Sequence, residues 1–144
     1  MVCFRRSLSL EPLITAPRQA REAVSQWLQE WQLAALSDVV LLILSELVTN
    51  ALLHAATPIE ITLTADRDEV KVAVADRDES HPDRRRRPDR PANGPGMYAP
   101  GGRGLTIIGG LADDWGVDNL AAGKQVWAVV KPPATWPHHQ DCQT

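Results

Sequence analysis

The sequence predicts one α+β domain, a two-layer sandwich in which a mixed, mostly antiparallel sheet carries helices on one face. Three observations lead to this fold class. Segments of alternating apolar residues occur in pairs, rather than each being followed by a helix. Two earlier segments have the three- and four-residue apolar spacing of helices. The chain has 144 residues, 44% hydrophobic and 23% charged, which is enough for one globular domain.

The N-terminal part predicts one strand and two helices. Residues 3–10 are expected to form a short strand, and Pro17 suits the first turn of a helix that runs to about Gln32. The second helix follows Ser37 and covers residues 38–55. It is apolar nearly all the way round, so we expect it to lie at the centre of the domain.

Two pairs of alternating segments predict β-hairpins. The first pair is 59–66 and 69–76, which are rich in Val, Ile and Thr and are separated by two polar residues. The second pair is 114–119 and 124–130, with Gly123 in the turn. Such alternation implies that one face of the sheet is buried and the other is wet.

The stretch between the hairpins is different. Residues 77–100 show no periodicity and hold five of the 11 prolines, so they predict a long loop, and loops of this length usually act as lids or are disordered. The glycine-rich turn 101–105 then leads into a short helix. The domain is expected to span residues 1–131, with 132–144 as a C-terminal tail.

Composition excludes several classes of protein. Cys3 and Cys142 form no CxxC pair, so neither a zinc site nor a disulfide framework is predicted, and the cytoplasm is the expected location. No targeting signal or membrane span is recognised. The pI near 5.8 argues against direct nucleic-acid binding. The arginines at 84–87 are interpreted as a solvated loop; contact with phosphates or an acidic partner is the alternative.

Three polar residues stand out in the second helix. Glu46, Asn50 and His54 are spaced by four and therefore lie along one helix face, among apolar neighbours. In a structural interpretation, Glu46 pairs with a core arginine and Asn50 caps a backbone group. We favour a functional one, in which the Asn50 amide oxygen binds Mg²⁺ and Glu46 orients a hydroxyl or a water for attack. A histidine near a helix end is more often a packing or capping residue.

Two further features could bind a ligand. Asp76 ends an alternating segment and could accept a hydrogen bond from the exocyclic amine of a base; a solvent-facing strand end is an equal alternative, and Asp78 competes for the role. In residues 101–105, glycines let the backbone approach a ligand, and the following helix N-terminus favours phosphate. Arg103 could contact the phosphate or be solvated. No P-loop motif is present.

In order and spacing, these features resemble the GHKL (Bergerat-fold) ATP-binding domains. The matching elements are ELVTNALLHA, a strand-end aspartate, a long loop, GGRGL and GKQVW. Within that superfamily the chain looks like the small bacterial anti-sigma factor serine/threonine kinases of the SpoIIAB and RsbW type. The resemblance covers residues 3–131 and implies ATP and Mg²⁺ as cofactors.

The resemblance also implies a role for individual residues. Glu46 matches the general base, Asn50 the Mg²⁺ ligand, and Asp76 the aspartate that binds the adenine amino group. Residues 77–100 match the ATP lid. The second glycine box, which wraps the phosphates, corresponds to Gly102, Arg103, Gly104 and Leu105.

Two departures from the family pattern are visible. Residues 77–80, Arg-Asp-Glu-Ser, stand where the family has glycines, so side chains replace bare backbone beside the nucleotide. Gln125 stands where the family often has threonine, and its amide could still bind the nucleotide.

The function implied is an ATP-dependent protein serine/threonine kinase that also sequesters a regulator. By resemblance its partners are a sigma factor and an anti-sigma-factor antagonist, with a possible homodimer and no membrane partner. The alternative is an ATP-binding switch without turnover: Glu46 favours the kinase, and the glycine-free stretch after Asp76 favours the switch. A histidine-kinase core is less favoured, because no helix with a phosphoacceptor histidine is recognised.

Overall fold

The computed structural model describes residues 3–78 and 110–137. These segments form five strands, two α-helices and one short 3-10 helix. In chain order they are β1 (Phe4–Leu10), α1 (Ala16–Glu30), η1 (Ala34–Leu36), α2 (Ser37–His54), β2 (Ile59–Ala65), β3 (Val70–Ala75), β4 (Asp114–Asn119) and β5 (Lys124–Val130). The glycine-rich turn 101–105, the arginines 84–87 and nearly all of the predicted loop lie outside the described residues.

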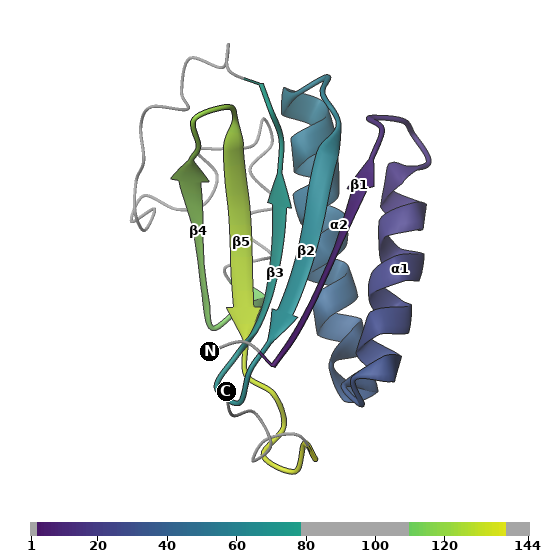
Figure 1. The fold of residues 1–144 in the computed structure, drawn as a ribbon, viewed down its shortest axis with the longest axis vertical. Coiled ribbons are helices and arrows are strands. Elements are labelled where there is room, and N and C mark those ends of the chain that lie inside the picture. Colours follow the sequence, from purple (N-terminus) through teal and green to yellow (C-terminus); the bar gives the residue numbers. More distant parts are fainter. Residues whose placement is uncertain (1–2, 79–109, 138–144) are drawn as a thin grey trace.

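The five strands form one sheet in the order β1-β2-β3-β5-β4 (Figure 1). Each of the four pairings is antiparallel, so the described strands include no parallel pair. Both predicted hairpins are present, and the later strand of the second hairpin, β5, lies next to β3. The predicted α+β class is therefore confirmed.

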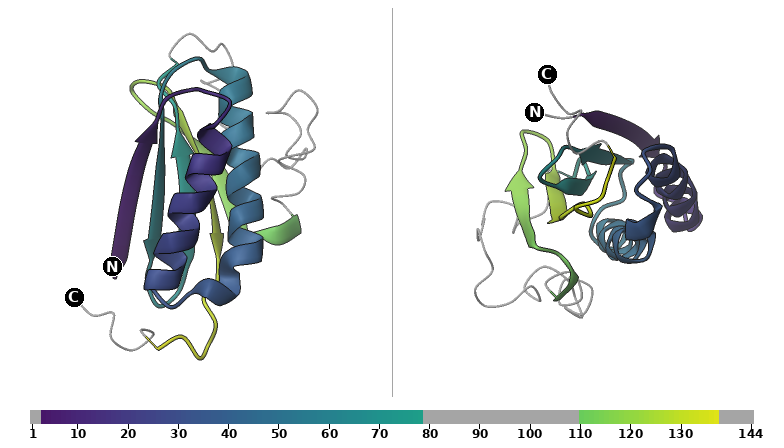
Figure 2. Two further views of the ribbon diagram at one scale, coloured as in Figure 1. Left: turned by 90° about the vertical axis from the view of Figure 1, so that its right-hand side faces the viewer. Right: turned by 90° about the horizontal axis from the view of Figure 1, so that it is seen from below.

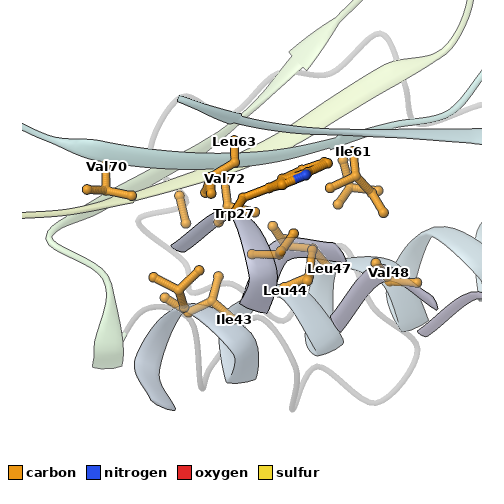
Figure 3. Close-up of a cluster of buried hydrophobic side chains, with 14 of the residues drawn as sticks. Trp27, Ile43, Leu44, Leu47, Val48, Ile61, Leu63, Val70 and Val72 are labelled. Atoms are coloured by element: carbon orange, nitrogen blue, oxygen red, sulfur yellow. The ribbon is translucent and has the colours of Figure 1, made fainter. Parts of the chain in front are cut away.

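Both long helices lie on one face of the sheet, which makes two layers (Figure 2). The core fills the space between them, because alternate side chains of β2 and β3 point toward the helices (Figure 3). Leu28, Leu44 and Leu63 have no exposed surface. Burial of a side chain of this size contributes about 1.5–3 kcal/mol to folding. The labelled core residues in Figure 3 are Trp27, Ile43, Leu44, Leu47, Val48, Ile61, Leu63, Val70 and Val72.

The segment Ala34–His54, which includes α2, is long and apolar enough to cross a membrane by length and composition alone. A core helix of a folded domain passes the same test. Here Ile43, Leu44 and Leu47 of α2 are buried against the sheet and α1. This packing accounts for the apolar residues on the buried face of the helix.

The first and last described segments are joined through aromatic residues. The Trp136 side chain is 3% exposed, and its Nε1–H donates to the carbonyl oxygen of Trp31 at 2.8 Å. The Phe4 ring stacks on Trp31 with 5.2 Å between ring centroids. The core therefore includes a residue of the segment assigned to the tail. Cys3, beside Phe4, is disulfide-bonded, so the expectation of no disulfide is wrong for this residue.

Candidate functional site

One side of α2 is left open by the described residues. Leu42 and Leu53 are 44% and 65% exposed and fall on the same helical stripe as Glu46, which is half-buried. Asn50 lies at the border between this stripe and the buried face of the helix, and is only 5% exposed. The polar residues predicted from their spacing thus sit where the core meets an open helix side.

Asn50 has an unusual environment for a buried amide. Its Oδ1 atom is buried and accepts no hydrogen bond from any described residue. Such an orphaned acceptor costs about 1–3 kcal/mol, and native proteins hold few of them. Glu46 likewise forms no ion pair or hydrogen bond with residues 3–78 or 110–137. Neither structural alternative, a core arginine for Glu46 or a backbone cap by Asn50, is seen in these ranges.

His54 occupies the last turn of α2 and is half-buried. A histidine at this end of a helix is favourably placed relative to the helix dipole, as expected for a capping or packing residue. Within the described segments, no group of three or more His, Cys, Asp or Glu side chains could hold a metal ion.

Asp76 is buried, so the solvent-facing alternative is wrong. It continues the alternation of Val70, Val72 and Val74, whose side chains point into the core, and its own side chain is 2% exposed. Its Oδ2 atom forms an ion pair with the Nζ atom of Lys124 at 2.8 Å. Its Oδ1 atom accepts the backbone N–H of Asp78 at 3.0 Å.

The backbone at Asp76 is held from two sides. Its N–H donates to the carbonyl oxygen of Lys124 at 2.9 Å, and the next N–H, of Arg77, donates to Thr57 Oγ1 at 3.0 Å. Gly123 in the β4–β5 turn has a φ of 98°, and a Cβ atom there would overlap the carbonyl oxygen of Asp76. Glycine is therefore required for the turn to come this close to β3.

Lys124 is the site residue that sequence reasoning missed. Along β5, Lys124, Val126 and Ala128 are buried toward the helices, whereas Gln125 and Trp127 are half-buried on the other face. Gln125 lines a polar hollow on the open face of the sheet and does not face α2. The period-two alternation of β5 is the signal that could have pointed to Lys124 instead.

Two hollows help to locate the site. The larger, a groove of 620 Å³ between α1 and α2, is lined by residues such as Arg21, Glu22 and Leu41 and holds none of the predicted site residues. A cavity of 190 Å³ at the strand ends includes Asp76 and Arg77 in its lining. Its lining includes no residue of α2, and Glu60 and Ala75 in it lie on the same sheet face as Gln125. We therefore place the candidate site at the open side of α2 and the buried Asp76 at the end of β3, and not in this cavity. Gly102, Arg103, Gly104 and Leu105 lie outside the described residues.

An antiparallel sheet backed by two helices, with buried polar groups on the central helix and at the ends of the central strands, is consistent with the GHKL-type ATPase fold that the sequence resembles. Residues 10–130 match the family model of the histidine kinase-like ATPase domain. The chain belongs to this family, and membership implies ATP binding.

Thirteen chains of solved structures are significantly similar. One is the crystal structure of the RsbU and RsbW domains of Rv1364c from Mycobacterium tuberculosis, with a TM-score of 0.59 and 18% sequence identity. The match covers 90% of the present chain but only 32% of that chain. This likeness supports the fold. No curated protein is significantly similar in sequence.

Proposed function

We propose that the chain binds ATP together with Mg²⁺ and transfers the γ-phosphate to a serine or threonine of a partner protein. The observation that carries this proposal is the buried Oδ1 atom of Asn50, which has no hydrogen-bond donor among the described residues and lies one helical turn from Glu46. An amide oxygen kept without a partner at that place is suited to a ligand that arrives later.

Each residue then has a chemical task. Asn50 would hold Mg²⁺, which when bound neutralises charge on the phosphates. Glu46, half-buried and unpaired among the described residues, would accept the proton of the attacking hydroxyl. Asp76 would recognise the adenine amine. Gln125 is left out of the proposal, because its side chain lies on the opposite face of the sheet.

The partner assignment extends the family resemblance. The protein of known structure described above contains an RsbU and an RsbW domain. This supports a function of the present chain that depends on binding to another protein or domain. We infer that this chain sequesters a sigma factor, phosphorylates an anti-sigma-factor antagonist in the cytoplasm and forms a homodimer.

Glu46→Gln separates binding from transfer. The substitution keeps the size of the side chain and removes the base, so we expect ATP and Mg²⁺ to bind as before and phosphate transfer to fall by about 100-fold or more. Binding is measured by calorimetry, and transfer with radiolabelled ATP and an anti-sigma-factor antagonist protein. Glu22→Gln, which changes an exposed carboxylate on α1, is the matched control and should leave both unchanged. Equal transfer by the Glu46 variant would refute the base assignment.

A second candidate function, an ATP-binding switch without turnover, is favoured by the surroundings of Asp76. Both carboxylate oxygens are already engaged, and Arg77 and Asp78 stand where bare backbone would ease access. Tight ATP binding by the wild-type chain with no transfer to any antagonist would support the switch. Absence of binding at millimolar ATP with Mg²⁺ would contradict both functions.

A further inference from the structure

Lys124 is a buried cation to which the proposed chemistry gives no task. Its side chain is 6% exposed, whereas Lys71 is half-buried and Lys131 is exposed. Burying an ammonium and a carboxylate together costs desolvation energy, and the attraction between the two charges often does no more than offset that cost. The Lys124–Asp76 pair is therefore expected to add little to the stability of the fold. Because Asp76 is the residue proposed to bind the adenine amine, we look for a functional role of the pair.

The pair is built into the fold by two neighbouring strands. Asp76 extends the core-facing positions of β3, and Lys124 starts the core-facing positions of β5. The strands are paired, and the Asp76 N–H also bonds the Lys124 carbonyl oxygen at 2.9 Å. Gly123 allows the turn to lie against the Asp76 backbone. The ammonium is thus directed to the carboxylate by backbone geometry on both sides.

The Asp76 carboxylate is buried and already has a hydrogen-bond partner on each oxygen, which limits its contact with a ligand. Lys124 Nζ lies 2.8 Å from Oδ2, the Asp78 N–H lies 3.0 Å from Oδ1, and only 2% of the side chain is exposed. An exocyclic amine is a neutral donor, so it is a poor replacement for an ammonium at a buried charge. Two of the roughly four acceptor sites of the carboxylate are in use, but the side chain is so buried that the amine must compete with the ammonium for the space around Oδ2.

We propose that Lys124 is a specificity-determining residue: its ammonium competes with the exocyclic amine of the base for Asp76 and so lowers the selectivity of the site for adenine. This inference rests on the proposed function, in which Asp76 recognises the base of ATP. The ammonium can also donate a hydrogen bond to a 6-oxo group. A site with Lys124 therefore binds a 6-oxopurine nucleotide better than a site in which Asp76 has no ammonium partner.

The test compares ATP with inosine triphosphate, which carries a 6-oxo group in place of the 6-amine. A hydrogen bond from an amine to an unpaired carboxylate changes affinity by roughly 10- to 100-fold. We expect the wild-type chain to prefer ATP by less than about 10-fold, and Lys124→Met to raise that preference by about 10-fold or more. Calorimetry of the full chain with each nucleotide and Mg²⁺ gives the dissociation constants.

Lys131→Met is the matched control, because it removes an exposed ammonium at the other end of β5. It should leave the preference for ATP as it is in the wild-type chain. An unchanged preference in the Lys124 variant, with both nucleotides binding, would overturn the role of Lys124 and leave the proposed function intact. Absence of nucleotide binding in both the wild-type chain and the Lys124 variant would overturn the proposed function, and this inference with it.

A second measurement needs no substitution, in case Lys124→Met does not fold. In the full chain labelled with ¹⁵N-lysine, a buried, paired ammonium should give a slowly exchanging NMR signal, with Lys71 and Lys131 as references. We expect the Lys124 signal to shift or disappear when ATP is added. A Lys124 signal that is unchanged at saturating ATP would overturn the inference.

Discussion

Asn50 has a buried acceptor that the described part of the fold leaves without a partner, and in the proposed function this acceptor is used by a ligand. Its buried Oδ1 atom has no donor among the described residues, so the folded chain carries an uncompensated desolvation cost. A leucine of similar size would remove that cost and fit the apolar neighbours Leu47 and Ala51. Residues that bind ligands are a common place for such local conflicts.

We therefore predict opposite effects of Asn50→Leu on stability and binding. The free energy of unfolding should stay the same or rise by about 1 kcal/mol, because an unsatisfied acceptor is removed. Affinity for ATP should lose its dependence on Mg²⁺. Urea denaturation and calorimetry measure the two quantities.

Gln29→Leu removes an exposed amide from α1 and is the control for both measurements. It should change neither stability nor Mg²⁺ dependence. A loss of several kcal/mol in the Asn50 variant would show that its amide is satisfied in the folded protein, contrary to our interpretation.

At the level of secondary structure, the β4–β5 turn packs against the end of β3 at Asp76. Gly123 brings the turn against the Asp76 backbone with a φ of 98°. Gly123→Ala combines a strained backbone with a steric overlap, so we expect the free energy of unfolding to fall by about 2–4 kcal/mol. Denaturant unfolding measures this change.

Gly110→Ala is the matched control for the turn, because a Cβ atom at Gly110 would meet no other atom within 4 Å. This change should leave stability within about 0.5–1 kcal/mol of wild type. If Gly123→Ala were equally harmless, the close approach of the turn to β3 would be refuted.

The elements themselves were largely predictable from local pattern. The alternation of residues 59–66 and 124–130 predicts β2 and β5, and the apolar character of residues 38–55 predicts α2, because burial imposes these periods directly. The same period applied within β5 predicts that Lys124 points inward. The family resemblance alone predicts Gln125 at the site, whereas the alternation along β5 places its side chain on the open face of the sheet.

At the scale of the whole molecule, a carboxy-terminal tryptophan stabilises the packing of α1 and β1. Trp136→Phe removes the indole N–H and leaves the buried Trp31 carbonyl oxygen without this donor. We expect a loss of about 1–3 kcal/mol in the free energy of unfolding, measured by thermal or urea denaturation.

Trp127→Phe is the control, since Trp127 is half-buried on the open sheet face, where it contacts the Lys71 ammonium at 5.1 Å. It should cost less than about 1 kcal/mol. An equal loss in both variants would mean that the Trp136 hydrogen bond contributes nothing specific.

Long-range features of the molecule were not predictable. The pairing of β3 with β5 joins strands far apart in sequence, and nothing in either strand's alternation specifies its neighbour. Trp136 lies in a segment without an apolar repeat, so the sequence pattern does not predict that this residue is buried. The Asp76–Lys124 ion pair depends on that same strand pairing, which is why Asp76 could be chosen from sequence without its partner.

The aromatic contact between the two ends of the domain has a practical consequence. Phe4 and Trp136 lie with their ring centroids 6.1 Å apart, at the end of the sheet where Phe4 pairs with Ala65. Asp76 and Lys124 lie at the opposite end, next to the pairing of Ala75 with Gln125. The chain therefore enters and leaves the described part of the fold at the end opposite Asp76 and Lys124, so a fluorophore, affinity tag or fused domain would be joined to the described domain at that end.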